Sequence, residues 1–255
     1  MSCDFLKKDR PTLTVMVQAK SVDRILELID KGLKGGADAF GVQIEVLEHK
    51  YRNEECFKRI FSAMQGKPAY VTNYRTGING DMSDEERTEQ LLLAVKCGAK
   101  LIDVMGDLFN KTEGELTHDA EAIQKQENLI KKIHFMGAEV LMSSHTYKFM
   151  PEEDVVSYVT EQHRRGADIA KVVTGAADGK ELSENIRISA KLSGDEFYPA
   201  LFLCTGDYCG KHRIVGPMIC GGMFLCVVEH DELATPAQPL LEQAKSAVEL
   251  ISKEG

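Results

Sequence analysis

Short apolar runs alternate along the chain with longer stretches in which apolar residues recur every three or four positions. The short runs predict buried strands, and the amphipathic stretches predict helices. The predicted strands are 12–18, 39–46, 69–74, 101–105, 139–143, 169–174, 198–204 and 222–228. The predicted helices are 21–34, 53–65, 84–97, 118–136, 151–165, 178–193, 210–220 and 238–252. One helix after each strand is typical of a parallel sheet with its helices outside.

Glycine marks several joins between a predicted helix and the strand that follows it. The joins are Gly35-Gly-Ala37-Asp, Gly98-Ala-Lys, Gly137-Ala-Glu and Gly166-Ala-Asp. Glycine accepts the left-handed conformation in which many helices end at no steric cost. Eight strand–helix pairs in 255 residues predict a (β/α)8 TIM barrel, with residues 1–255 forming a single domain. The alternative is a doubly wound open sheet, which normally has a glycine-rich phosphate turn after its first strand; Gln18-Ala-Lys-Ser21 is not such a turn.

Composition and charge exclude several classes of partner. The net charge of −9 is spread along the chain, which argues against nucleic acid. No apolar run approaches the ~18 residues of a membrane span. Residues 1–10 lack the apolar centre of a signal peptide, which predicts a cytoplasmic protein. The seven cysteines contain no CxxC pair, so we expect neither a disulfide framework nor a zinc site.

Two polar residues at the ends of neighbouring predicted strands suggest covalent catalysis. Lys171 lies inside the apolar segment 167–173, where alternation places it opposite Ala170, and His145 ends the segment 141–145. Burial favours the neutral form of an amine, and a free amine beside a proton-transfer group is what imine formation with a ketone or aldehyde requires. We therefore predict that Lys171 forms an imine and that His145 is a general acid/base. The alternatives are a lysine that reaches solvent past the helices and a surface histidine.

Other polar residues near strand ends are candidates for binding the substrate, because barrel active sites lie at the carboxyl ends of the strands. Arg75 and Arg213 suit a carboxylate or phosphate, although either could form an ordinary surface ion pair. Gln43 and Glu45 are alternate residues of one predicted strand and so share a face. A buried Glu45 needs a partner, for which Arg75 on the next strand is the obvious choice, and that pair could be purely structural. Gln238 follows the last strand.

An ordered set of segments resembles the type I 3-dehydroquinate dehydratase family, shikimate-pathway enzymes with a TIM barrel and a lysine imine. The segments are Val71-Thr-Asn-Tyr-Arg75, Leu101-Ile-Asp103, Met142-Ser-Ser-His145, Gly166-Ala-Asp-Ile-Ala-Lys171, Thr205-Gly206 with His212-Arg213, and Ala234-Thr-Pro-Ala-Gln238. The resemblance implies that Lys171 forms the imine and that His145 is the acid/base. It also implies that Arg75, Arg213 and Gln238 bind the substrate carboxylate and hydroxyls. Because the protonated imine takes up the electrons, neither a metal nor an organic cofactor is expected.

The chain departs from the family pattern around the substrate. The family's Glu-x-Arg on the second strand is Gln43-Ile-Glu45 here. Met105 stands where we expect a glutamate that orients the histidine, and Asp107 is the nearest acidic substitute. The segment 205–213 has one displaced glycine and a histidine in place of the family's serine. These changes predict a divergent member that keeps the imine chemistry and has an altered substrate preference.

The resulting hypothesis is a lyase that dehydrates 3-dehydroquinate, or a related hydroxy-keto acid, to 3-dehydroshikimate. Its partner is a small keto acid rather than nucleic acid or a membrane, and a homodimer is expected because dimers are common for this barrel. One alternative is a class I aldolase that uses the same lysine on a different carbonyl substrate. The other is a relative that binds the ligand without catalysis.

Overall fold

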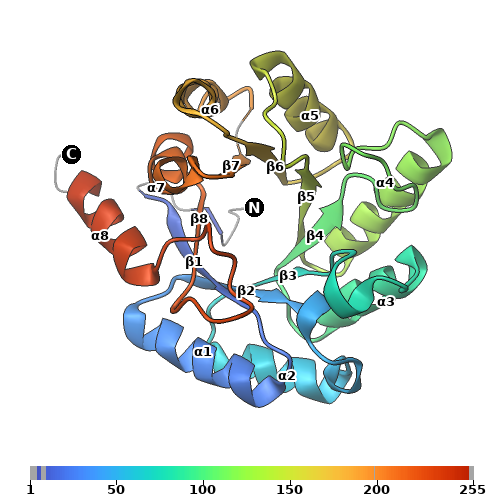
Figure 1. Ribbon diagram of the computed structural model, residues 1–255. Helices are drawn as coiled ribbons and strands as arrows, with labels where there is room; N and C mark the ends of the chain where they lie inside the picture. The colour runs from blue at the N-terminus through green and yellow to red at the C-terminus, as the bar shows by residue number, and fades with distance from the viewer. Residues whose placement is uncertain (1–4, 7–9, 198, 253–255) are drawn as a thin grey trace.

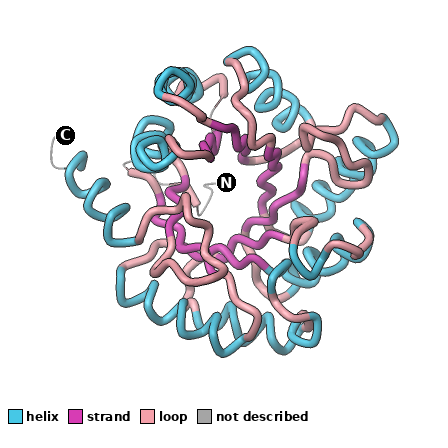
Figure 2. Tube along the Cα trace, in the orientation of Figure 1, coloured by secondary structure: helices cyan, strands magenta, loops and turns pink. Residues whose placement is uncertain are grey.

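The computed structural model describes residues 5–6, 10–197 and 199–252. Within this part of the chain, eight parallel strands form a ring, and helices surround it (Figures 1 and 2). The strands are β1 (Thr12–Val17), β2 (Ala39–Gln43), β3 (Ala69–Thr72), β4 (Leu101–Met105), β5 (Glu139–His145), β6 (Ile169–Gly175), β7 (Ala200–Thr205) and β8 (Met223–Cys226). The α-helices are α1 (Val22–Gly35), α2 (Glu54–Ala63), α3 (Asp84–Lys96), α4 (Ala120–Phe135), α5 (Glu152–Arg164), α6 (Gly179–Leu192), α7 (Cys209–Cys220) and α8 (Leu241–Ser252).

The strands are hydrogen-bonded in the order β7-β6-β5-β4-β3-β2-β1-β8, and the paired strands run parallel. The predicted (β/α)8 TIM barrel is therefore confirmed. The local signals also act as expected: Ser83 and Glu86 form a reciprocal capping box at the start of α3. Gly36 has a φ of 88° after α1, where its N–H donates to the last carbonyls of the helix.

The inside of the barrel is filled by apolar side chains from alternate positions of the strands. They include Met16, Leu101, Leu141, Ile169, Val173, Leu201, Leu203 and Leu225. A separate and larger apolar cluster lies between strands β1 to β5 and the helices that cover them. Each strand is buried on one face by the barrel interior and on the other by the helices. This explains why the predicted strands are nearly continuous apolar runs.

Two predicted boundaries differ in ways that affect the site. Strand β2 ends at Gln43, and Ile44–Val46 forms a 3₁₀ turn, so Gln43 and Glu45 are not alternate residues of one strand. Arg52 holds this turn by donating to the carbonyls of Glu45 and Leu47, at 3.1 and 2.7 Å. Strand β3 ends at Thr72, which leaves the following polar residues in a loop. Tyr198, the first residue of the seventh predicted strand, lies outside the described residues.

No helix in the described part of the chain is both long and apolar enough to cross a bilayer.

The barrel interior should dominate stability. Leu141 is fully buried in the middle of β5, inside the barrel. We expect Leu141→Ala to lower the free energy of unfolding by about 2–5 kcal/mol, because it leaves a cavity that the rigid strands cannot close. Urea denaturation measures this loss. Leu250→Ala is the control, since Leu250 is 68% exposed, and it should change stability by less than about 0.5 kcal/mol; equal losses would contradict the assignment of the core.

Candidate active site

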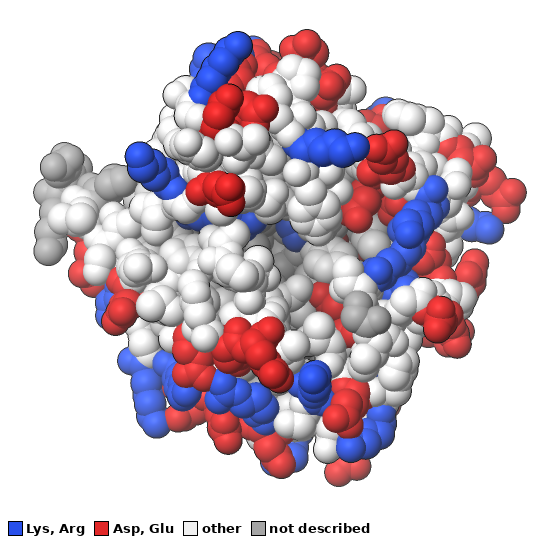
Figure 3. All heavy atoms as spheres, in the orientation of Figure 1, with Lys and Arg blue, Asp and Glu red and all other residues white. Residues whose placement is uncertain are grey.

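A cavity of about 310 Å³ opens at the carboxyl ends of the strands. Figure 3 shows the hollow near the centre of this face, with basic side chains visible inside it. Six of the seven predicted site residues line the cavity: Gln43, Arg75, His145, Lys171, Arg213 and Gln238. Side chains from most of the strands thus converge on one space large enough for a small molecule.

Lys171 lies inside the barrel on β6, where alternation predicted it, and is 5% exposed. Its Nζ lies 2.6 Å from the hydroxyl of Tyr74 and 3.4 Å from both the hydroxyl of Tyr70 and Oδ2 of Asp103. Asp103 is buried on β4 and compensates the charge of the lysine. The amine therefore reaches the cavity from a polar cluster within an otherwise apolar interior.

His145 is the last residue of β5 and is held by Glu115. The Nδ1 atom of His145 lies 2.7 Å from Oε2 of Glu115, and the backbone N–H of His145 donates to the same oxygen at 3.0 Å. Asp107, which the sequence offers as a possible acidic substitute, does not contact His145: its carboxylate binds Arg75 and the backbone N–H of Thr112. Glu115 was missed in the sequence. The only signal is the long segment between β4 and α4, which exceeds the usual length of a connection in a compact barrel.

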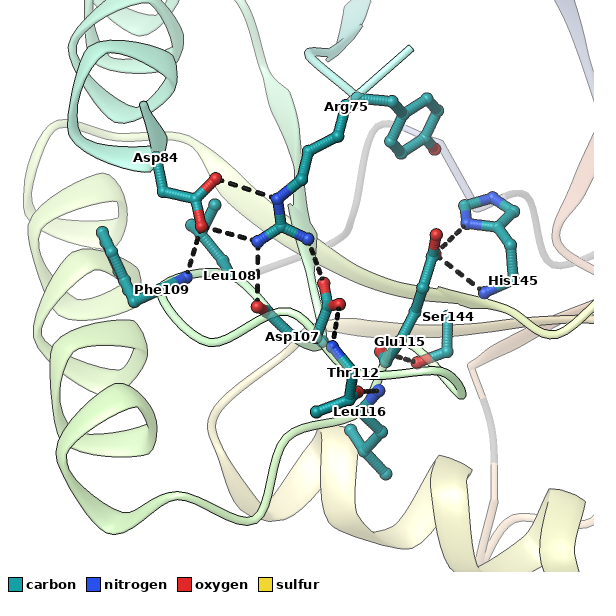
Figure 4. A network of polar contacts seen from close by, with 12 residues as sticks. Arg75, Asp84, Asp107, Leu108, Phe109, Thr112, Glu115, Leu116, Ser144 and His145 are labelled. Carbon is teal, nitrogen blue, oxygen red and sulfur yellow. Dashed lines mark hydrogen bonds and ion pairs between the residues drawn. The ribbon is translucent and has the colours of Figure 1, made fainter. Parts of the chain in front are cut away.

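The loop that carries Glu115 is held by hydrogen bonds from side chains outside the loop to its backbone carbonyls. Arg165 donates to the carbonyls of Gly106 and Thr117, at 3.0 and 2.5 Å, and Gln126 also donates to Gly106. The Ser144 hydroxyl donates to the carbonyl of Glu115 at 2.7 Å. Glu115 has a φ of 50°, a conformation that non-glycine residues adopt rarely and that the surrounding contacts must hold. Figure 4 shows the bond from Ser144 to Glu115 and the Glu115 carboxylate facing His145.

Arg75 lines the cavity but is held by two carboxylates. It donates to both oxygens of Asp84, at 3.0 and 2.6 Å, and to the side chain and carbonyl of Asp107, at 2.7 and 3.0 Å (Figure 4). Burial alone would lower the pKa of Arg75, but these bonds outweigh it and raise the pKa. The expected pairing of Arg75 with Glu45 is wrong, because Arg75 pairs with the two aspartates and Glu45 has other partners. Arg75 thus joins β3, α3 and the loop of Glu115, and its contact with a substrate stays a prediction.

Buried Glu45 and half-buried Gln43 form a pair next to the cavity. The Thr72 hydroxyl lies 3.0 and 2.9 Å from the two carboxyl oxygens of Glu45, and Gln43 Nε2 donates to one of them at 2.9 Å. Burial is the largest influence and raises the pKa of Glu45, which favours its neutral form. The Oε1 atoms of Gln43 and Gln238 are buried and have no hydrogen-bond partner among the described residues. Both residues line the cavity, so two acceptors without a protein donor lie at its wall.

Arg213 is a buried cation at the opposite wall. It lies on α7, is 5% exposed, and donates from Nε to the carbonyl of Cys204 at 2.7 Å. In the described part of the chain, no acidic side chain pairs with it, in contrast to Arg75. Burial is the main cause that lowers the pKa of Arg213, although arginine remains protonated in proteins. A buried guanidinium without a carboxylate favours an anionic ligand.

Comparisons with known proteins agree with this geometry. The model of the Type I 3-dehydroquinase family matches residues 13–254. The chain belongs to this family. Among individual relatives, the 3-dehydroquinate dehydratase of Methanobrevibacter smithii is 29% identical over 178 residues. The match covers 69% of this chain and 68% of that protein. The chloroplastic bifunctional 3-dehydroquinate dehydratase/shikimate dehydrogenase of Arabidopsis thaliana is 26% identical over 239 residues, 92% of this chain but only 36% of the longer relative.

A solved type I 3-dehydroquinate dehydratase from Clostridium difficile, modified covalently by comenic acid, shares the fold. Its TM-score is 0.82 at 17% identity, and the match covers 98% of this chain and 96% of that one. At this level of identity the likeness concerns the barrel rather than the site. The family match and the cavity agree: the first shows membership of an enzyme family, and the second has room for a small molecule.

The pairing of Arg75 with Asp84 gives this 3-dehydroquinase a testable pH dependence. Burial alone would raise the pKa of Asp84, but the bonds from Arg75 and from the Phe109 N–H outweigh it and lower the pKa. A lowered folded-state pKa stabilises the fold above the unfolded value of about 3.9, and this stabilisation is lost as pH falls through the folded-state pKa. We expect Asp84→Asn to destabilise the protein by about 1.5–3 kcal/mol at pH 7.

Urea denaturation at several pH values measures this effect. The difference between the wild type and Asp84→Asn should narrow below about pH 4, where the wild-type carboxylate takes up its proton. Asp81→Asn, on the exposed turn just before α3, is the matched control and should stay within about 0.5 kcal/mol of the wild type. A difference that is as large at pH 3 as at pH 7 would contradict an ion pair at Asp84.

Proposed function

We propose that the protein dehydrates 3-dehydroquinate, or a closely related hydroxy-keto acid, to 3-dehydroshikimate through an imine on Lys171. The observation that carries the proposal is the shared cavity. A buried amine, a histidine held by a carboxylate and a buried arginine without an acidic partner all face it. These groups match a nucleophile, a proton-transfer group and a carboxylate receptor.

In the proposed reaction, the neutral amine of Lys171 adds to the ketone carbon, one proton is taken up, and water leaves to give a protonated imine; the final hydrolysis releases that proton again. His145 then removes a proton from the carbon next to the imine carbon, and the electron pair of that C–H bond moves toward the imine nitrogen. The electrons return to expel the β-hydroxyl, which leaves as water with the proton from His145. Hydrolysis frees the product and restores the amine, so the net change is the loss of one water molecule.

The remaining residues have roles that follow from their contacts. With Glu115 at Nδ1 of His145, we assign the proton there to Nδ1, which leaves Nε2 for the substrate. Arg213 binds the substrate carboxylate, and the free oxygens of Gln43 and Gln238 accept hydrogen bonds from its hydroxyls. Arg75 completes one wall of the cavity while it fixes the loop of Glu115.

Glu115 also bears on the alternatives. A relative that binds without catalysis was considered because the orienting acid is missing from β4, where Met105 stands; a carboxylate at 2.7 Å from His145 removes that reason. A class I aldolase would use the same lysine but would break a carbon–carbon bond. The two are distinguished by products, because only dehydration of 3-dehydroquinate generates a conjugated enone, which is detected by its ultraviolet absorbance.

The first test is reductive trapping of the imine. Borohydride added with 3-dehydroquinate should give a covalent adduct, which intact mass and peptide mapping place on Lys171. Lys171→Ala should give no adduct, whereas His145→Ala should still form one and lose turnover by about 10²–10⁴-fold. A folded wild-type protein that gives no adduct would reject 3-dehydroquinate as the substrate, and a Lys171→Ala variant with full activity would rule out the imine mechanism.

The second test concerns Glu115. Glu115→Gln keeps the shape of the side chain but removes the charge that supports a protonated His145, so we expect kcat to fall by about 10–10³-fold while imine trapping persists. Steady-state kinetics and trapping on the same preparation separate the two effects. Glu113→Gln is the matched control from the same loop, because Glu113 is 89% exposed and pairs only with Lys148. Equal kinetics for the two variants would contradict an orienting role.

We further propose that residues 1–255 form one domain that acts as a homodimer in the cytoplasm. The described cysteines are free thiols, which suits a reducing compartment. The dimer is proposed because symmetric dimers are the commonest assemblies of soluble enzymes and are common for this barrel. Light scattering on the purified protein tests it.

A further inference from the structure

A cluster of hydroxyl groups surrounds the carboxylate that lies beneath Lys171. Asp103 accepts hydrogen bonds from Tyr70 and Tyr74 at Oδ2 and from Ser143 at Oδ1, the last two at 2.5 Å. All four residues lie on β3, β4 and β5 or directly after β3. A buried carboxylate needs such donors, but one of these hydroxyls does more than satisfy Asp103.

The hydroxyl of Tyr74 lies between the amine and the carboxylate. It is 2.6 Å from Nζ of Lys171 and 2.5 Å from Oδ2 of Asp103, whereas the direct distance from Nζ to Oδ2 is 3.4 Å. The amine thus has a direct but long contact with the carboxylate, whereas the route through the phenol consists of two short hydrogen bonds. Burial first, and the charge of Asp103 second, raise the pKa of Tyr74 well above its ordinary value. The phenol thus stays neutral, able to accept from the lysine and donate to the aspartate.

Tyr70 provides a comparison within the same cluster. It donates to the same oxygen of Asp103 but lies 3.4 Å from Nζ and does not line the cavity, whereas Tyr74 does. The ring of Tyr74 also meets that of His145 edge to face, with centroids 5.0 Å apart. Tyr74 is thus the hydroxyl in contact with both the reacting nitrogen and the space where a carbonyl group binds.

We propose that Tyr74 is a catalytic residue that relays a proton between Lys171 and Asp103 during imine formation. The inference rests on the imine chemistry of the proposed function and adds a residue to it. It assigns a group that removes the proton of the Lys171 ammonium, a step for which the roles given to Lys171 and His145 do not provide. A buried ammonium is not a nucleophile, and some group must take its proton and later return it.

The transfer balances without any further reactant. The Lys171 ammonium gives a proton to the Tyr74 oxygen as the Tyr74 proton moves to Asp103, leaving a neutral amine, a neutral phenol and a neutral carboxylic acid. Condensation of a neutral amine with a ketone to give a protonated imine and water consumes one proton. Asp103 returns that proton through Tyr74 to the oxygen that leaves as water, and its carboxylate then pairs with the positive imine.

The test uses formaldehyde and cyanoborohydride on the full chain, because this one-carbon aldehyde forms an imine without needing the substrate-binding residues. Peptide mapping gives the methylation rate of Lys171 relative to Lys20, whose side chain is 62% exposed. We expect Tyr74→Phe to lower the relative rate at Lys171 by about 10-fold or more. Tyr70→Phe, the matched variant, should lower it by less than about 3-fold, since it leaves the path from Lys171 to Asp103 intact.

The direction in which Tyr74→Phe changes the methylation rate of Lys171 distinguishes a proton relay from a hydroxyl that is only structural. If Tyr74 only stabilised the ammonium, its removal would release free amine and speed methylation, which would overturn the proposal. Equal losses in Tyr74→Phe and Tyr70→Phe would also overturn it, because both would then act only by supporting Asp103. Phenylalanine keeps the ring contact with His145; if that variant does not fold, Tyr74→Leu gives the same readout.

A parallel reaction with 3-dehydroquinate in place of formaldehyde distinguishes the two proposals. Absence of a 3-dehydroquinate adduct in the wild type rejects the proposed substrate. The effect of Tyr74→Phe on formaldehyde labelling then still decides whether the relay exists.

Discussion

The burial of one ammonium group inside the barrel is the constraint on which the rest of the site depends. A charge in an apolar interior costs several kcal/mol unless it is paired and hydrogen-bonded. Lys171 replaces one of the apolar side chains that fill the barrel, and Asp103 on β4 supplies the opposite charge. Asp103 itself must be satisfied, which explains the hydroxyls of Tyr70, Tyr74 and Ser143 around it. The polar cluster is therefore a consequence of placing an amine where water is scarce.

A second chain of contacts orients the histidine from a distance. Arg75 is clamped to Asp84 on α3 and to Asp107, and Asp107 binds the backbone within the loop that ends in Glu115. Each link is charge-assisted and mostly buried, so the position of one carboxylate is defined by elements on both sides of the loop. This arrangement allows a loop residue to hold the histidine at the end of β5. The carboxylate that orients His145 thus comes from a loop rather than from a strand.

The sequence predicts what depends on local periodicity and misses what depends on packing. The strand pattern placed Lys171 inside the barrel because side chains alternate with a period of two. The end of an apolar run located His145 at a strand end. It failed for Glu45, because Arg52 draws the chain into a 3₁₀ turn where the pattern predicted a strand. Glu115 lies 30 residues from His145 in a loop without periodicity, so no local signal connects the two. Asp103 could have been singled out by the same reasoning as Lys171, because it too is a charged residue within an apolar predicted strand.

The pairing of charges in the cavity also limits which substrate fits. Lys171 is balanced by Asp103, Arg75 by two aspartates and His145 by Glu115, whereas burial favours the neutral form of Glu45. Among the described buried cations that line the cavity, Arg213 alone has no acidic partner, which suits a ligand with a single negative charge. The unpaired oxygens of Gln43 and Gln238 require donors such as hydroxyl groups. A hydroxylated monocarboxylate supplies both the single negative charge and the hydroxyl donors, and a ketone on it would suit the imine proposed for Lys171. A phosphorylated sugar, with its greater charge, would leave part of that charge unpaired in a site built around one arginine.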